Sequence, residues 1–145
     1  MHNFLSKSLN DTEKIALDII NKAKLAPVDG SFVITLSGNL GSGKTTLTQF
    51  IAKELGINEH VKSPTFLIME TYPISFGRFH RLIHLDAYRI ERPEEVGNLG
   101  FADLLKDPSN LIILEWPEKM PQFVPENAFR VNLSFIDKDI REISF

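Results

Sequence analysis

The sequence predicts an α/β fold in which helices flank a mixed, largely parallel β-sheet that also carries antiparallel strands. Three observations favour this fold. An apolar, β-branched run at residues 31–37 is typical of a buried strand, and a glycine-rich loop and an amphipathic helix follow it directly. Residues 111–114 form a second continuous apolar run that fits a buried strand. Two further pairs of strand-like segments are separated by turn residues and predict antiparallel hairpins.

The chain has 145 residues, a length that fits one compact domain, so we expect a single domain over residues 1–145. An apolar content of 43% and a charged content of 24% are ordinary for a globular protein and argue against disorder. The sequence has no cysteine, which excludes disulfides and thiolate zinc sites. The first residues lack the apolar segment of a signal peptide, so the cytoplasm is the expected location.

The net charge argues against a surface that binds nucleic acid. The chain carries a formal charge of −3 and has an isoelectric point near 5.8, whereas binding to phosphate backbones needs clustered Lys and Arg. If RNA takes part in the function, we expect another chain to hold it. No run approaches the roughly 18 apolar residues of a membrane span, so membrane association is not expected.

Two helices are expected in the first part of the chain. Asn10, followed three residues later by Glu13, predicts a capping box, and apolar residues at helical spacing extend this helix to about Lys24. The second helix starts near Lys44, directly after the glycine-rich loop, and stops at Gly56. Its predicted buried face consists of Leu47, Phe50, Ile51 and Leu55.

The rest of the chain is expected to form strands with short helices between them. Residues 66–72 and 81–86 predict two antiparallel strands, joined by a turn within residues 73–77. Short helices are expected from Pro93 and from Phe101. The last expected strands span residues 111–114, 129–135 and 141–145, with a turn at residues 137–139.

The glycine-rich loop matches the eight-residue Walker A pattern in full. It consists of Gly38, Asn39, Leu40, Gly41, Ser42, Gly43, Lys44 and Thr45. Glycines let backbone N–H groups curl around a β-phosphate, and the following helix directs its positive end at the same group. Lys44 is expected to bridge the β- and γ-phosphates, and the Thr45 hydroxyl to bind Mg²⁺. The strand before the loop and the helix after it favour a nucleotide-binding P-loop over a glycine turn that only caps a helix.

Two carboxylates are candidates for the acidic residue that a P-loop site needs. Asp86 and Glu115 each end an apolar strand, and a residue in that place binds Mg²⁺, usually through water, or orients the attacking water. The sequence does not decide between them. Thr65 lies where switch enzymes place a threonine that senses the γ-phosphate, although Pro-Thr before a strand is also a common turn.

Several other side chains have more than one interpretation. His80 and His84 share one face of an expected strand, but no third ligand accompanies them, so surface positions are expected rather than a metal site. Trp116 is either a core residue or a neighbour of the nucleotide. Arg89 and Arg92 are either solvated or contact phosphate or a partner.

Four blocks of the sequence together resemble the TsaE (YjeE) family of ATPases, over nearly the whole chain. The blocks are Gly38 to Leu47, Ser63-Pro64-Thr65-Phe66, His84-Leu85-Asp86-Ala87-Tyr88-Arg89 and Glu115-Trp116-Pro117-Glu118. Each block is modest alone, but the four in this order are highly specific. The resemblance implies that the chain binds ATP and ADP with Mg²⁺ and hydrolyses ATP slowly.

The resemblance also implies partners. Members of this family act with two sugar-kinase-like subunits, TsaB and TsaD, which install threonylcarbamoyl on adenosine 37 of tRNAs that read codons beginning with A. Hydrolysis is taken to reset that complex between turnovers, and the chain reaches tRNA only indirectly.

Carried onto this sequence, the resemblance assigns roles to individual residues. The expected catalytic residues are Lys44, Thr65, Asp86 and Glu115. Mg²⁺ is expected at Thr45 with Asp86 or Glu115, and the nucleotide at the loop residues, Thr46 and Trp116. Asn39 departs from the family, whose members commonly have an acidic residue there, so the role of that carboxylate is not carried over. Phosphate binding by the loop backbone does not depend on it.

Three other functions are alternatives to an ATPase of this family. A small nucleotide or nucleoside kinase shares the loop but needs a lid and an acceptor site, for which 145 residues leave little length. A guanine-nucleotide switch is unsupported, because Asn21-Lys22-Ala23-Lys24 lacks the aspartate of the guanine-reading tetrad and precedes the loop. The third alternative is a nucleotide-binding module without meaningful turnover.

Overall fold

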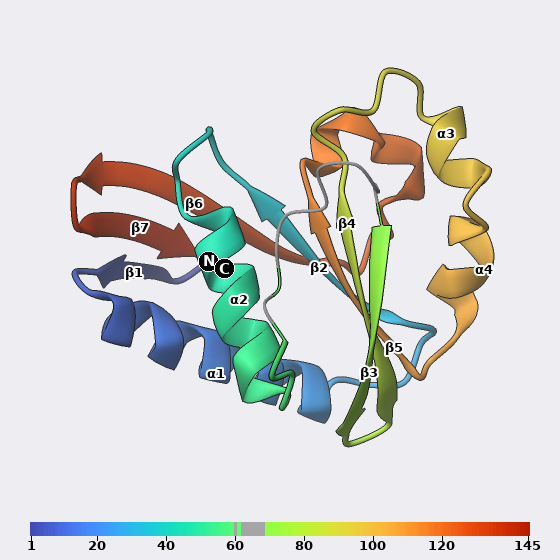
Figure 1. Cartoon of the computed structure of the whole chain (residues 1–145), viewed down its shortest axis with the longest axis horizontal. Helices are drawn as coiled ribbons and strands as arrows, with labels where there is room; N and C mark the ends of the chain where they lie inside the picture. Colours follow the sequence, from blue (N-terminus) through green and yellow to red (C-terminus); the bar gives the residue numbers. More distant parts are fainter. Residues whose placement is uncertain (60, 62–68) are drawn as a thin grey trace.

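The computed structural model describes residues 1–59, 61 and 69–145, which form one sheet with helices packed on both faces (Figure 1). The strands are β1 (Asn3–Ser6), β2 (Phe32–Ser37), β3 (Met69–Phe76), β4 (Phe79–Asp86), β5 (Asn110–Glu115), β6 (Phe129–Asp137) and β7 (Ile140–Ser144). The helices are α1 (Leu9–Leu25), α2 (Lys44–Glu54), α3 (Glu94–Gly97) and α4 (Phe101–Lys106), with short 3-10 turns η1 (Pro117–Lys119) and η2 (Pro121–Phe123).

The centre of the sheet is parallel and its edges are antiparallel. The strand order in the described part of the chain is β1-β7-β6-β2-β5-β4-β3. Parallel pairing joins β6 to β2, β2 to β5 and β5 to β4, whereas β1 with β7, β7 with β6, and β4 with β3 pair antiparallel. The predicted α/β class with a mixed sheet is therefore confirmed.

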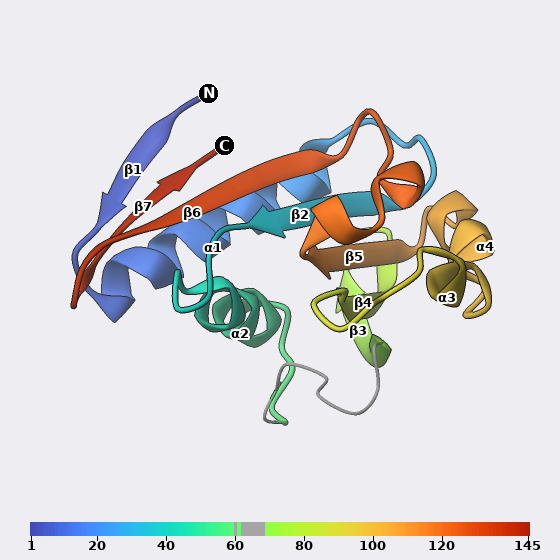
Figure 2. The ribbon, with the colours of Figure 1, turned by 90° about the horizontal axis from the view of Figure 1, so that it is seen from above.

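Alternate residues of the central strands pack against helices on opposite faces of the sheet. On one face Leu36 and Ile113 join the apolar residues of α1 and α2 in one core cluster. On the other face Ile112 and Leu114 join Phe101 of α4. Figure 2 shows α1 and α2 on the same side of β2 and β6. Burial on both faces explains why β2 and β5 are continuous apolar runs in the sequence. No described helix has the length and apolarity to cross a membrane.

The N-terminal segment differs from the prediction in two ways. Residues 3–6 form β1, which the sequence does not predict because a segment of four residues is too short to give a clear periodicity. Its partner is β7, so the two ends of the chain lie side by side (Figure 1). The predicted capping box at Asn10 is wrong, because Ser8 is the N-cap of α1. The Ser8 hydroxyl accepts a hydrogen bond from the Asp11 N–H at 3.1 Å, which satisfies a backbone donor of the first turn.

Strands β3 and β4 form the predicted antiparallel hairpin, with a tighter turn than expected. Strand β3 continues to Phe76, and Gly77 turns the chain with a φ of 56°. Pro73 lies inside β3, where a missing N–H is tolerated because β3 is an edge of the sheet. The first residues predicted for this strand, 66–68, lie outside the described residues.

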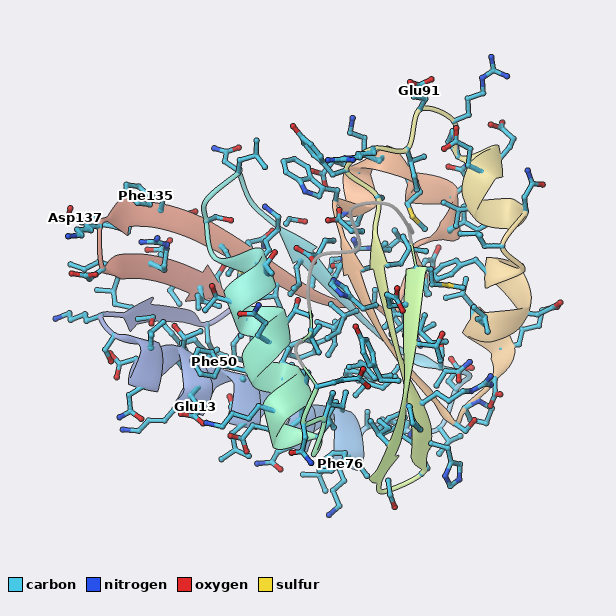
Figure 3. The ribbon with its side chains drawn as sticks, viewed as in Figure 1. Glu13, Phe50, Phe76, Glu91, Phe135 and Asp137 are labelled. Carbon is cyan, nitrogen blue, oxygen red and sulfur yellow. The ribbon has the colours of Figure 1, made fainter. Side chains whose placement is uncertain are left out.

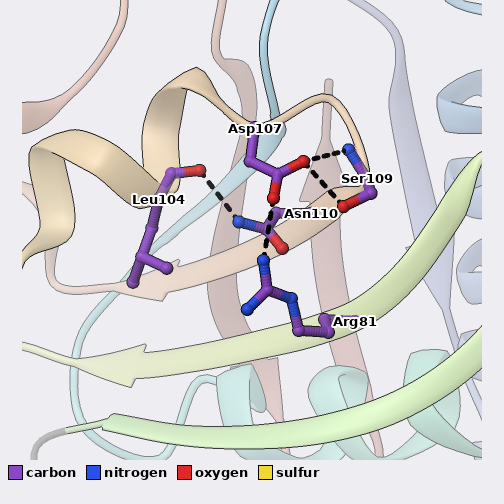
Figure 4. A network of polar contacts seen from close by, with 5 residues as sticks. All are labelled: Arg81, Leu104, Asp107, Ser109 and Asn110. Carbon is purple, nitrogen blue, oxygen red and sulfur yellow. Dashed lines mark hydrogen bonds and ion pairs between the residues drawn. The ribbon is translucent and has the colours of Figure 1, made fainter.

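A polar cluster fixes the turn between α4 and β5, at the amino end of β5 (Figure 4). The Asp107 carboxylate accepts hydrogen bonds from the Ser109 hydroxyl at 2.6 Å and the Ser109 N–H at 2.9 Å. It also accepts one from the Arg81 guanidinium at 2.8 Å, and Asn110 Nδ2 donates to Leu104 O at 3.0 Å. The hydrogen bonds from Ser109, followed by the Arg81 charge, lower the pKa of Asp107 below its ordinary value.

Candidate functional site

Three parallel strands bring their carboxyl ends together at one edge of the sheet. Glu115, at the end of β5, is the register partner of Leu36 in β2 and of Asp86 in β4. The glycine-rich loop follows β2, so the loop and both predicted carboxylates meet at this edge. Ligands of open α/β sheets bind in the crevice outside the carboxyl ends of the strands.

The loop backbone has the shape of an anion cradle. Gly38, Gly41 and Gly43 have φ values of 157°, 79° and 101°. At Gly38 an added Cβ would collide with Leu133 O and the Ser42 side chain, so this position requires glycine. Helix α2 then begins without a capping side chain from the described residues. Among the described residues, no side chain competes with an anion for its first N–H groups.

The Lys44 ammonium is folded into the loop. Its Nζ donates to Gly38 O at 2.5 Å and to Asn39 O at 3.0 Å, and the residue is only 6% exposed. The same Nζ lies 4.4 Å from the centre of the Trp116 ring. Burial lowers the pKa of Lys44, and nearby carboxylates, led by Glu115, oppose that shift. The loop cation and a candidate catalytic carboxylate are thus close enough to act on one another.

Trp116 adopts an unusual backbone conformation beside this lysine. With a φ of 61°, it is the one non-glycine residue with positive φ among those described. Its ring packs against the Tyr88 ring, with 5.1 Å between the centres, and its backbone N–H donates to Leu36 O at 3.3 Å. Of the two positions expected for it, the structure places Trp116 over the phosphate-loop lysine, at the margin of the apolar core.

Asp86 and Glu115 lie side by side on the face of the sheet that α2 covers. Because Asp86 and Glu115 are register partners on neighbouring parallel strands, their side chains point to the same face of the sheet. Leu82 and Ile113, which precede them on the same strands, also point to this face and belong to the cluster formed with α1 and α2. Glu115 is only 2% exposed. Asp86 is half-buried and accepts a hydrogen bond from the Tyr88 N–H at 3.0 Å. One carboxylate is therefore enclosed and the other is reached from solvent.

His84 is a buried partner of Glu115, and its predicted surface position is wrong. The residue is 0% exposed, and its Nε2 lies 2.5 Å from Glu115 Oε2. His80, four residues earlier on the same strand, is exposed as expected. A polar residue that alternates with apolar ones usually faces solvent, but β4 has strands on both sides and helices over this face.

The residues at this edge offer oxygen ligands that suit Mg²⁺. Thr45 lies in the first turn of α2, and Asp86 and Glu115 are the neighbouring carboxylates. In the described ranges, no group of three or more His, Asp or Glu side chains could hold a metal. This donor set fits Mg²⁺, which takes one or two protein carboxylates and shares its other positions with phosphates and water.

A cavity of about 330 Å³ adjoins the loop on the side of β1 and the β6–β7 hairpin. Ser42, Gly43 and Thr46 line it from the loop and α2, and the junction of β1 with α1 forms a second wall. The third wall contains Lys138 and Arg141. The sequence analysis missed this cavity because its walls come from three distant segments without a motif. The one available signal is Lys138 in the predicted last turn and Arg141 at the start of the predicted last strand.

Arg141 also closes the turn of the β6–β7 hairpin. Its guanidinium donates to Asp137 O at 2.7 Å and to Lys138 O at 3.3 Å, and it stacks 4.6 Å from the Phe135 ring centre. Phe135 and Asp137 mark this outer end of the hairpin (Figure 3). One side chain therefore shapes both the turn and the cavity wall.

The remaining predicted residues are distributed around this edge. Asn39, Leu40 and Gly41 are exposed at the tip of the loop, and Thr46 is half-buried in α2. Thr65, the predicted switch residue, lies outside the described residues. Arg89 and Arg92 are both exposed.

Comparison with known families gives this site a context. The family model described as "Threonylcarbamoyl adenosine biosynthesis protein TsaE" matches residues 6–143. The chain belongs to the TsaE family. The matched range contains the phosphate loop, both candidate carboxylates and the walls of the cavity, so the whole site lies within the TsaE region. TsaE proteins take part in the biosynthesis of tRNA threonylcarbamoyladenosine.

TsaE proteins of distant bacteria resemble this chain over most of its length. The one from Haemophilus influenzae is 37% identical over 113 residues, which cover 78% of this chain and 68% of that protein. The one from Bacillus subtilis is 32% identical over 139 residues, which cover 96% and 82%. The crystal structure of Bacillus subtilis YdiB gives a TM-score of 0.73 at 27% identity, and the match covers 98% of this chain and 82% of YdiB. The chain therefore shares the P-loop fold of this family.

Proposed function

We propose that this TsaE family member binds ATP with Mg²⁺ and hydrolyses it slowly, and that this activity supports threonylcarbamoylation of adenosine 37 in tRNAs that read codons beginning with A. The observation that carries the proposal is the meeting of Lys44, Asp86 and Glu115 at the carboxyl ends of β2, β4 and β5. A phosphate cradle alone supports nucleotide binding. Carboxylates beside it are the groups that phosphoryl transfer to water requires.

The loop and the cavity support a pose for the nucleotide. In this pose the phosphates lie at the N-terminus of α2. Their oxygens accept hydrogen bonds from the Lys44 ammonium and replace Gly38 O and Asn39 O as its partners. The nucleoside enters the cavity of about 330 Å³, next to Thr46 and Arg141. That volume is within the usual range for a small-molecule site, about 300–1,000 Å³.

The chain's own groups then divide the chemistry. Lys44 balances charge on the β- and γ-phosphates. Thr45, Asp86 and Glu115 would hold Mg²⁺ directly or through water, and bound Mg²⁺ supplies neutralisation of phosphate charge. We assign orientation of the attacking water to the enclosed carboxylate of Glu115, because exclusion of bulk solvent strengthens its interactions.

The proposed role depends on partners. We assign the two sugar-kinase-like subunits TsaB and TsaD as those partners, with tRNA reached only through them, because a chain with a net charge of −3 lacks the basic surface that binds RNA directly. The proposal treats residues 1–145 as one ATPase domain that acts in the cytoplasm. P-loop enzymes are commonly slow until a partner completes the site.

The decisive experiment measures ATP hydrolysis by the chain alone and with TsaB, TsaD and tRNA. We expect a slow rate for the isolated chain and stimulation of about tenfold or more in the complex. The Lys44→Ala variant is the control and should show no turnover under either condition. Unchanged rates together with failure to co-elute with TsaB and TsaD would contradict the proposal. Phosphorylation of an added nucleoside would instead identify a kinase.

A further inference from the structure

His84 and Glu115 form a buried polar pair that joins the two strands carrying the candidate carboxylates. His84 lies on β4 two residues before Asp86, and its register partner is Ile113, two residues before Glu115 on β5. The contact is therefore diagonal across the two strands, a separation that long side chains bridge. Their exposures are 0% and 2%, and 2.5 Å separates Nε2 from Oε2.

On its inner side this pair borders the apolar core. Leu82 and Ile113 share its face of the sheet and belong to the main core cluster. An apolar side chain at position 84 would pack here without the desolvation cost of an imidazole and a carboxylate. The pair therefore calls for a role other than filling the core.

The direction of the hydrogen bond follows from the acceptors available. The contact joins His84 Nε2 to Glu115 Oε2. An ionised carboxylate only accepts, so we assign Nε2–H as the donor. His84 Nδ1 has no hydrogen-bond partner within the described ranges. A bare lone pair at a buried position costs less than an unpaired N–H, which favours the tautomer with the proton on Nε2 over the one with the proton on Nδ1.

We propose that His84 is a positioning residue for Glu115. Its Nε2–H holds Oε2 and thereby fixes the rotation of the carboxylate, which by itself turns freely about its last bond. Glu115 is the foremost carboxylate acting on the Lys44 ammonium, so its orientation matters where the phosphates bind. The inference rests on the proposed function, because it gives Glu115 a part in hydrolysis. Groups that orient such side chains through one hydrogen bond typically affect activity by about 10- to 100-fold.

The test compares His84→Leu with His84→Gln in single-turnover ATP hydrolysis by the full chain. We expect His84→Leu to lower the hydrolysis rate by about 10- to 100-fold. ADP affinity without Mg²⁺ should stay within about twofold, because the loop backbone and Lys44 bind the phosphates. His84→Gln keeps an N–H near the position of Nε2 and should recover the rate to within about threefold of the original chain. The matched control is His80→Leu, the same change at an exposed position of the same strand, which should have no effect.

A double-variant cycle separates this inference from the proposed function. If His84 acts through Glu115, then adding His84→Leu to Glu115→Gln slows the reaction no further. A full additional loss in that background would overturn the positioning role, as would a His84→Leu rate within twofold of the original while Glu115→Gln is inactive. A Glu115→Gln rate equal to the original would instead remove the proposed role of Glu115 itself.

A readout on the unaltered chain does not depend on how the variants fold. Nitrogen-15 NMR of the imidazole should show a proton on Nε2 and a bare Nδ1 for His84, with a slowly exchanging Nε2–H signal that His84→Gln removes. A proton on Nδ1 with a bare Nε2 would overturn the inference.

Discussion

The Lys44 ammonium lies 4.4 Å from the centre of the Trp116 ring, so the cation of the phosphate loop touches the residue that follows β5. Lys44 also binds two carbonyls of its own loop. A phosphate group that binds the loop has to draw the ammonium from these partners. The aromatic ring is therefore next to the side chain that the proposed nucleotide binding would move.

This contact predicts that nucleotide binding changes the fluorescence of Trp116. It is the only tryptophan of the chain, so the emission has one source. Loss of a cation over the indole face and exclusion of water by the nucleotide both alter its surroundings. Titration with ADP and with a non-hydrolysable ATP analogue checks the prediction, with Lys44→Met as a control that keeps the fluorophore. Emission that ignores saturating nucleotide would count against placing Trp116 at the site.

Lys44→Met is expected to separate binding from stability. Removal of the ammonium should weaken ADP affinity about 100-fold, because charge-assisted hydrogen bonds to phosphate are lost. Burial lowers the pKa of Lys44, so folding disfavours its charged form. That cost is full below the lowered pKa, declines as pH rises from the lowered to the ordinary lysine pKa, and is absent above it. At pH 7 the variant should therefore melt at the same temperature as the original chain or higher.

Lys53→Met is the matched control on the same helix. Lys53 forms a 2.7 Å ion pair with Glu13 of α1, and that hydrogen bond raises the pKa of Lys53. We expect unchanged ADP affinity and a slightly lower melting temperature, because the link between α1 and α2 is lost. Calorimetry measures the affinities, and thermal unfolding the stabilities. A clear fall in the melting temperature of Lys44→Met would contradict the argument from burial.

Arg141→Gln is expected to weaken nucleotide binding by about tenfold. The guanidinium lines the cavity and holds the turn of the β6–β7 hairpin, so its loss affects both a wall and a positive charge. Arg130→Gln removes the same charge from an exposed position of β6 outside the cavity walls and should leave affinity unchanged. Equal affinities for the two variants would place the nucleoside elsewhere.

Asp107 predicts an acid-dependent part of the stability. Its pKa is lowered in the folded chain, so the carboxylate stabilises the fold above the ordinary aspartate pKa of about 3.9, and this contribution is lost as pH falls through the lowered value. Asp107→Asn should be less stable at pH 7, and the difference should shrink as the pH falls below about 4. Asp103→Asn, at an exposed position of α4, is the control. Urea unfolding at a series of pH values measures the difference; one that stays constant with pH would contradict the assignment.

Local sequence was sufficient for those parts of the site that are contiguous in the chain. Gly38 and Gly43 occupy the positions of positive φ that the motif requires, and Lys44 follows at the start of α2. The strands that end in Asp86 and Glu115 were recognisable because strands buried on both faces are mostly apolar, and His84 is the polar exception within β4. The roles of these residues, and of Thr65, stay predictions.

The parts that the sequence did not predict depend on partners from distant segments. The hydrogen bond between His84 and Glu115 exists because β4 and β5 are neighbours in register, which no local pattern encodes. Strand β1 is defined by its pairing with β7, and the cavity by three separate walls. The N-cap of α1 was misplaced at Asn10 because Ser8 and Asn10 are both good capping residues, and contacts decide between them.

Glu115 owes its position to simultaneous register with Leu36 and Asp86 on separate parallel strands. Such pairings close long loops, and they form late in folding because the loss of chain entropy precedes the gain from contacts. The P-loop motif is one contiguous stretch of sequence, whereas Asp86 and Glu115 come next to it only when β2, β5 and β4 have paired. Under the proposed function, nucleotide affinity requires the completed central sheet, and a nucleotide that binds only the folded chain would stabilise that sheet as a whole.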